Sequence, residues 1–173
     1  MDNAILDFLK SRRSTRKFKS EQISDEILEA VLEAGTYAPT GKGAQCPVIV
    51  AVQDPETHGQ LIRMNARILG SNGDPYYGAP TILVILAPKT SHTYIEDASC
   101  VNTYLQLAAH AAGLGSVWVH REKEMFETEG GKALLKKWGL SEDMVGIGAV
   151  ALGYADCDPP APAVRKKDYV IRI

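Results

Sequence analysis

The choice between two fold classes depends on one run of residues, Val145-Gly146-Ile147-Gly148-Ala149-Val150-Ala151-Leu152-Gly153. As a string, Gly146-x-Gly148-x-x-Ala151 matches the glycine fingerprint of dinucleotide-binding folds. That fingerprint needs a helix directly after the glycines and a further strand–helix–strand unit beyond it. Here the glycines lie inside an apolar run, no helical pattern follows, and the chain ends at residue 173. We therefore predict a buried strand whose glycines mark close approach of another backbone or a ligand.

Working outward from this run, strand and helix patterns cover most of the remaining chain. Apolar runs predict strands at residues 48–52, 81–86 and 116–119, and an alternating pattern predicts a last strand at 168–173. Helical spacing predicts helices over 2–11, capped by Asp2 or Asn3, then from Ser24 to Gly35, over 55–69 and over 94–112, with a short one from Lys132. The helix at 94–112 is apolar on most faces, which predicts a buried central helix. These elements indicate an α+β fold in one domain, residues 1–173.

Composition limits the classes of function. A net charge of −2 provides no global field for nucleic acid or an acidic membrane surface. No run approaches the length of a membrane-spanning helix, and the N-terminus lacks the pattern of a signal peptide. Cys46, Cys100 and Cys157 are widely spaced, which argues against a disulfide framework or a zinc knuckle. We expect a cytoplasmic protein with no metal, no membrane and no nucleic acid partner.

A basic cluster, Arg12-Arg13-Ser14-Thr15-Arg16, is the strongest local signal in the chain. Such a run is often a solvated surface. Here a hydroxyl is interleaved with guanidinium groups, a combination that suits a phosphate dianion. A second basic group surrounds Arg165, and the two together suggest convergence on one anion.

Other candidate residues have competing interpretations. The four histidines lack metal-ligand spacing, and His110 is expected to be a hydrogen-bonded core residue. His120 follows a buried strand, where ligands often bind, so a structural and a binding role both stay open. The loop at 37–47 is small-residue rich and, on composition alone, typical of a connector. No serine, cysteine or threonine has a visible base partner for covalent catalysis.

Taken in order, these segments resemble the nitroreductase family of flavin mononucleotide (FMN) enzymes over essentially the whole chain. The matching landmarks are Arg12–Phe18, Ala38–Thr40 through Gln45, Tyr77–Pro80, Leu107–Gly115, and Ala151–Tyr154 with Arg165. The resemblance implies a three-layer α/β/α sandwich with a mixed, mostly antiparallel sheet flanked by helices. It also implies a homodimer with FMN at the subunit interface and a C-terminal strand, Tyr169–Ile173, exchanged onto the partner subunit.

The resemblance also implies roles for individual residues. The FMN phosphate would be held by four cluster residues and one from the C-terminal segment: Arg12, Arg13, Ser14, Arg16 and Arg165. A loop would approach the flavin from the partner subunit through Pro39, Thr40, Gly41 and Gln45. The ring would be lined by Trp118, His120 and Arg121. Gly43 and Cys46-Pro47 depart from the asparagine and Pro-Trp that many members carry, so substrate preference does not transfer.

The absence of an acid–base constellation fits this family, because the flavin carries the chemistry and no side chain is expected to be catalytic. The expected activity is a ping-pong reduction of nitroaromatic, quinone or similar acceptors at the expense of NAD(P)H. One alternative keeps the fold but has a specialised flavin reaction, such as reductive dehalogenation, flavin consumption or a dehydrogenase-type oxidation. Another is a non-catalytic protein that binds flavin or phosphate.

Overall fold

The computed structural model describes residues 3–173 and contains a four-stranded sheet at its centre. The strand order is β1 (Val48–Val52), β2 (Thr81–Pro88), β4 (Met144–Gly153) and β3 (Gly115–Val119), and all neighbouring strands are antiparallel. The run at residues 145–153 is thus an inner strand, which confirms the predicted buried strand. The expectation of a mostly antiparallel sheet is confirmed, and the one parallel pairing in the described chain is an isolated bridge between Ser14 and Ser116.

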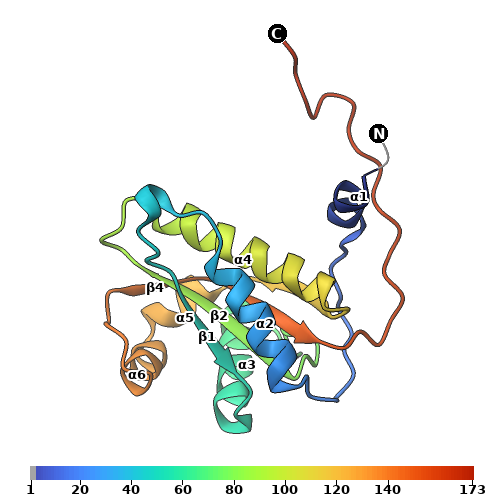
Figure 1. Cartoon of the computed structure of the whole chain (residues 1–173). Coiled ribbons are helices and arrows are strands. Elements are labelled where there is room, and N and C mark those ends of the chain that lie inside the picture. Colours follow the sequence, from blue (N-terminus) through green and yellow to red (C-terminus); the bar gives the residue numbers. More distant parts are fainter. Residues whose placement is uncertain (1–2) are drawn as a thin grey trace.

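Helices cover both faces of the sheet and make three layers (Figure 1). Side chains of β2 alternate between the faces, as the strand geometry requires. Ile82 and its alternate neighbours pack with α3 (Pro55–Leu69), α5 (Glu122–Glu127) and α6 (Glu129–Lys137). Leu83 and its alternate neighbours pack with α2 (Asp25–Thr36) and α4 (Tyr94–Ala111). The predicted α/β/α sandwich is confirmed.

Local capping explains where the helices begin. Asn3 accepts hydrogen bonds from the first backbone N–H groups of α1 (Ala4–Ser11), and the alternative cap, Asp2, lies outside the described residues. Ser24 caps α2, and Asp54 with Pro55 behind it opens α3, as predicted. These caps satisfy N–H groups that have no partner within the helix.

Two helix boundaries differ from the sequence predictions because of packing. Gly35 does not end α2; it is buried inside the helix, where a Cβ would collide with the side chain of Leu105. A glycine at this position lets α2 and α4 approach closely. The single short helix predicted from Lys132 is in fact preceded by a second, α5, and Thr128 separates the two by capping α6 at the N–H of Gly131.

The surface of α4 and the C-terminal segment also differ from expectation. One side of α4 faces solvent through Ile95 and Tyr104, so the helix is not buried all round. The strand predicted at 168–173 is not formed in the single chain, whose residues after the bridge at Ala155 run as an extended tail (Figure 1). A strand needs a neighbouring backbone to pair with, and the chain itself offers none here.

Candidate functional site

The basic cluster is fixed along the edge of the sheet by backbone hydrogen bonds. The N–H of Thr15 donates to the carbonyl of Ser116 at the start of β3, 3.0 Å away. Gly115 leaves room for this contact, because a Cβ there would collide with the side chain of Thr15. Further along, the N–H of Lys19 donates to Tyr154, and Phe18 is buried in the core. The sheet therefore holds the cluster in a defined place.

The guanidinium of Arg12 is left without a partner in this place. Its Nη1 is buried and makes no hydrogen bond to any part of the described chain. Burial, and then the nearby charge of Arg13, lowers the pKa of Arg12. Lys10 and Lys17 in the same region are paired with Asp7 and Asp156, whereas no ion pair is formed by an arginine of the cluster within residues 3–173.

Two neighbouring groups, Arg13 and His110, surround Arg12, and only Arg13 adds positive charge. Arg13 donates to the carbonyls of Lys10 and Arg12, at 2.8 and 2.7 Å, which orients it beside Arg12. His110 on α4 stacks on Phe8 and lies 2.7 Å from the hydroxyl of Ser11. Burial first, and then the two arginines, lower the pKa of His110, which keeps this imidazole neutral. A buried donor and uncompensated charges fit a phosphate dianion. Ser14 is half-buried and Arg16 exposed in the same segment.

A second group of predicted residues lies at the far end of β3. The indole of Trp118 covers Gly148 on β4, and its Nε1 is buried without a partner in the described chain. The predicted close approach of another backbone is confirmed at Gly146, where the carbonyl of Glu122 lies, whereas at Gly148 the approaching group is a side chain. The ring of His120 lies 6.1 Å from that of Trp118, and both His120 and Arg121 are exposed. Arg121 pairs with Glu124 at 2.9 Å.

The two groups are in line along one edge strand. Ser116 pairs with the cluster, and His120 follows four positions later, about 13 Å away at roughly 3.3 Å per residue. An extended ribityl phosphate can span that distance. The arrangement therefore fits a ligand with a phosphate at one end and a planar ring at the other, each end meeting an unpaired donor.

The loop that contains Pro39, Thr40, Gly41 and Gln45 is ordered, not a loose connector. Asp97 on α4 is buried and accepts hydrogen bonds from the N–H of Gly41, at 2.8 Å, and the hydroxyl of Thr93, at 3.0 Å. The N–H of Gln45 donates to Thr40 at 3.0 Å, and Gln45 has a positive φ of 50°. Thr40 and Gln45 line two hollows of about 460 and 560 Å³ beside α2, and Pro39 lines the second.

This loop lies far from the other two groups within one chain. It leads into β1, and β1 and β3 are the opposite edges of the sheet, about 14 Å apart at roughly 4.8 Å per strand. Its anchor, Asp97, is separated from His110 by about 20 Å of helix at roughly 1.5 Å per residue. Arg165 is also apart: it lies on the extended tail, and its guanidinium donates to the carbonyl of Ala163. One chain therefore brings together only part of the predicted site.

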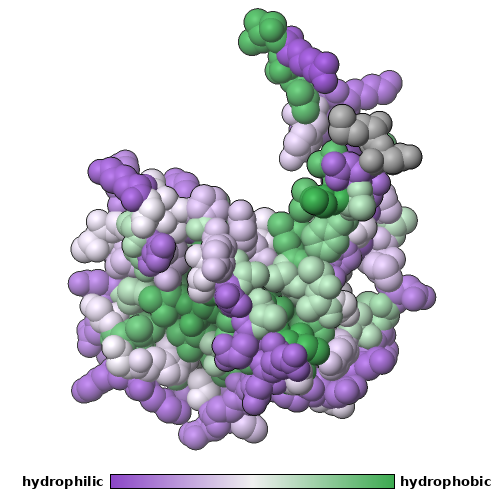
Figure 2. Space-filling model, viewed as in Figure 1, coloured by the Kyte–Doolittle hydropathy of each residue, from purple (hydrophilic) through white to green (hydrophobic). Residues whose placement is uncertain are grey.

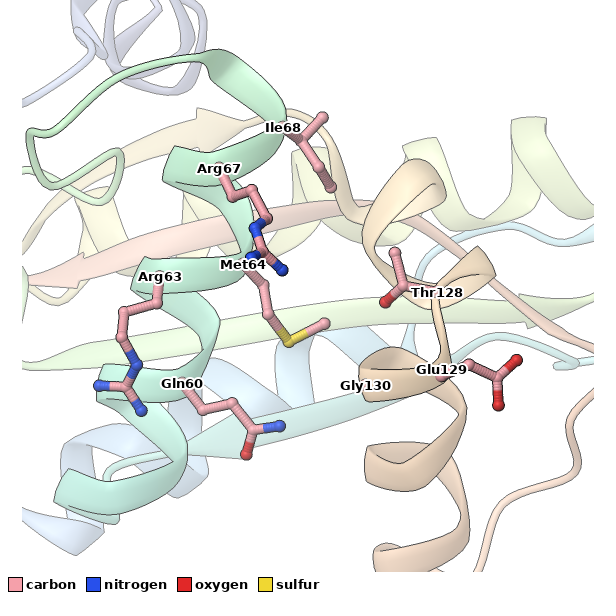
Figure 3. A pocket seen from close by; sticks show the side chains of 8 residues that line it. All are labelled: Gln60, Arg63, Met64, Arg67, Ile68, Thr128, Glu129 and Gly130. Atoms are coloured by element: carbon pink, nitrogen blue, oxygen red, sulfur yellow. The ribbon is translucent and has the colours of Figure 1, made fainter.

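A groove between α3 and α6 has a volume of about 580 Å³ and contains none of the predicted residues (Figure 3). Its lining includes Arg63 and Arg67 on one side and Thr128 on the other. Among residues 3–173, no three histidine, cysteine, aspartate or glutamate side chains gather as metal ligands. No helix in that part of the chain is both long and apolar enough to cross a membrane.

Some residues of structural importance near the site escaped sequence reasoning. Asp97 has a local signal, since it is an acidic residue in the first turn of a helix. Nothing in the sequence indicates that it is buried and reaches back to Gly41. Asn65, Tyr76 and Glu122 are also buried, under the turn after β3, and come from three separate elements.

Comparison with known proteins agrees with this geometry. A protein of Archaeoglobus fulgidus, which carries the provisional name NADH dehydrogenase/NAD(P)H nitroreductase, is 33% identical over 156 residues, covering 86% of this chain and 84% of its own length. A nitroreductase of Bacteroides fragilis, solved with bound FMN, superposes with a TM-score of 0.90 at 26% identity, covering 99% of this chain and 100% of its own.

An iodotyrosine deiodinase, solved with FMN and 3-iodo-L-tyrosine, shares the fold, with a TM-score of 0.77 at 24% identity, covering 97% of each chain. The family model described as the nitroreductase family matches residues 9–154. That span includes the basic cluster, the loop at 37–47 and the whole sheet. The chain belongs to the nitroreductase family.

Proposed function

We propose that the chain binds FMN and uses NAD(P)H to reduce small electron acceptors of the nitroaromatic or quinone type. The observation that carries the proposal is the buried, unpaired Nη1 of Arg12, in the segment that pairs with the start of β3, together with the unpaired indole N–H of Trp118 toward the other end of that strand. A phosphate would accept a hydrogen bond from Arg12, and the edge of a flavin would lie beside the indole N–H of Trp118.

Each group of residues has a role in this site. Arg12, Arg13, Ser14 and Arg16 hold the phosphate, since guanidinium groups bind phosphate through paired hydrogen bonds. Trp118, His120 and Arg121 lie along the ring, and Arg165 adds positive charge from the C-terminal segment. Bound FMN would supply the chemistry for hydride transfer between NAD(P)H and the acceptor. No side chain needs to act as acid or base, and the open face admits reductant and acceptor in turn.

The site is completed by a second copy of the chain. The loop with Pro39, Thr40, Gly41 and Gln45 leads into the edge of the sheet opposite its own β3, so it serves the partner's flavin. Apolar side chains are exposed on α1 and on the tail (Figure 2). Ile5 on α1 is 71% exposed and Ile171 on the tail 81% exposed. A homodimer in which the tail pairs with the partner's backbone would bury both.

The test is an anaerobic experiment on purified protein loaded with FMN. The expected result is a bound-flavin absorbance spectrum that bleaches quickly with NADPH or NADH and returns when a nitroaromatic or quinone is added. Very slow reduction by both nucleotides would instead favour a specialised flavin reaction on the same fold. FMN uptake without any redox turnover would indicate a binding protein, and no uptake at all would overturn the proposal.

A further inference from the structure

Three buried polar side chains lie beneath the turn that joins β3 to α5. They are Asn65 on α3, Tyr76 in the loop before β2, and Glu122 at the start of α5, with exposures of 1%, 0% and 0%. The hydroxyl of Tyr76 donates to Oε1 of Glu122 at 3.0 Å, and Nδ2 of Asn65 donates to that hydroxyl at 3.3 Å. Polar groups this deeply buried destabilise a fold unless they are hydrogen-bonded, and each of the three has at least one such bond, although Oε2 of Glu122 has no partner in the described chain.

The same cluster holds the backbone of the turn on both sides of Arg121. Nδ2 of Asn65 donates to the carbonyl of His120 at 2.8 Å, and Tyr76 holds the side chain of Glu122. Between these two points, Arg121 has a φ of 94°, in the left-handed region that side chains other than glycine avoid. Such a conformation persists only where the surroundings determine it, and it is concentrated at functional sites.

The cluster acts through hydrogen bonds and not through charge. Burial, with a smaller contribution from the nearby charge of Glu124, raises the pKa of Glu122 to about 8. Glu122 is therefore protonated at neutral pH. Burial also raises the pKa of Tyr76 far above its ordinary value. The carbonyl of Glu122 packs directly on Gly146 of β4, so the turn is in contact with the sheet.

We propose that Asn65, Tyr76 and Glu122 are positioning residues that orient the peptide groups of residues 120–122 toward the flavin ring. This inference rests on the FMN site proposed above, in which that turn lies along the ring. An apolar trio would fill the same volume, but it would not hold the carbonyl of His120 or the left-handed backbone of Arg121. The polar cluster is thus explained by the turn it fixes.

The test uses matched variants of the full-length protein. Tyr76→Phe removes one hydroxyl, and Tyr77→Phe makes the same change at the next residue, which is exposed and outside the cluster. Asn65→Leu removes the contact to His120. Glu122→Gln keeps an acceptor for Tyr76 and is the conservative variant, which should keep the flavin spectrum and the reduction rate of the wild type at neutral pH.

The first readout is hydrogen exchange, in protein without FMN, of the backbone N–H of Met125, which donates to the carbonyl of Arg121 at 2.9 Å. Tyr76→Phe and Asn65→Leu should speed this exchange roughly tenfold, the effect of losing about one buried hydrogen bond. The second readout is the FMN-loaded protein. In both variants the flavin absorbance maximum should shift and reduction by NAD(P)H should slow by about tenfold, as expected when a ring contact is misplaced. FMN affinity, set at the phosphate end, should stay within roughly threefold of the wild type.

The outcomes distinguish a positioning role of the cluster from a role in packing alone. Unchanged exchange, spectrum and reduction rate in Tyr76→Phe and Asn65→Leu would show that the cluster only fills space. Faster exchange with an unchanged spectrum would show that the turn is held but does not meet the ring, which also overturns the inference. If the wild type takes up no FMN, the proposed function fails, and the exchange data still show whether the cluster holds the turn.

Discussion

Replacing Arg12 with methionine is expected to weaken FMN binding without destabilising the protein that lacks FMN. The guanidinium has a buried Nη1 with no partner in the described chain, and burial and Arg13 lower its pKa. Its charge is therefore unfavourable until an anion arrives. A hydrogen bond to a charged group contributes about 1.5–3 kcal/mol, so the dissociation constant should rise about 10- to 150-fold.

Fluorescence titration with FMN measures the affinity, and thermal unfolding without FMN measures the stability. Lys10→Met is the matched control, because Lys10 is exposed and already paired with Asp7. It should leave FMN affinity within about twofold, as expected of a surface pair. Equal affinities in the two variants would refute a phosphate contact by Arg12. A clear loss of stability in Arg12→Met would show that its guanidinium supports the fold instead.

Three further predictions concern pH, the loop and the tail. The pKa of Glu122 is raised to about 8 in the fold from an ordinary 4.5, so the contribution of this group to stability is full below pH 4.5 and is lost as pH rises to about 8. In urea titrations Glu122→Gln should remove this loss, on the order of 3 kcal/mol by pH 7, and an unchanged pH dependence would contradict it. Asp97→Ala removes the hydrogen bonds from Gly41 and Thr93 and should release the loop at Gly41. The FMN dissociation constant should then rise about tenfold, with thermal unfolding as the control for stability. An unchanged dissociation constant would exclude the loop from the site. A chain ending at Pro160 should be monomeric by light scattering and bind FMN poorly, whereas a stable dimer would show that the tail is dispensable.

Much of the fold could be predicted because its signals are local. The run at residues 145–153 is apolar throughout, which is typical of a strand buried on both faces, and it is an inner strand between β2 and β3. Ser24 and Asp54 are N-caps that lie next to the helices they begin. Gly35 was misjudged because its role is a contact with Leu105 on another helix, which a local pattern does not contain.

The candidate site was predictable to a lesser extent. The basic cluster is contiguous, so the sequence displays it directly. Its alignment with Trp118 and His120 depends on pairing between Ser14 and Ser116, which are remote in sequence. The buried cluster of Asn65, Tyr76 and Glu122 joins residues 11 and 46 positions apart and follows no periodic pattern. The sequence also cannot show that a terminal strand lacks a partner within its own chain.

The measurement that tests the central claim most directly is the anaerobic absorbance spectrum of the FMN-loaded protein before and after NAD(P)H. This account predicts a bound-flavin band that bleaches with the nucleotide and returns with a nitroaromatic or quinone acceptor. The Arg12→Met variant should need a much higher FMN concentration to give the same band. A wild-type protein that takes up no FMN, or whose flavin neither nucleotide reduces, would contradict the account.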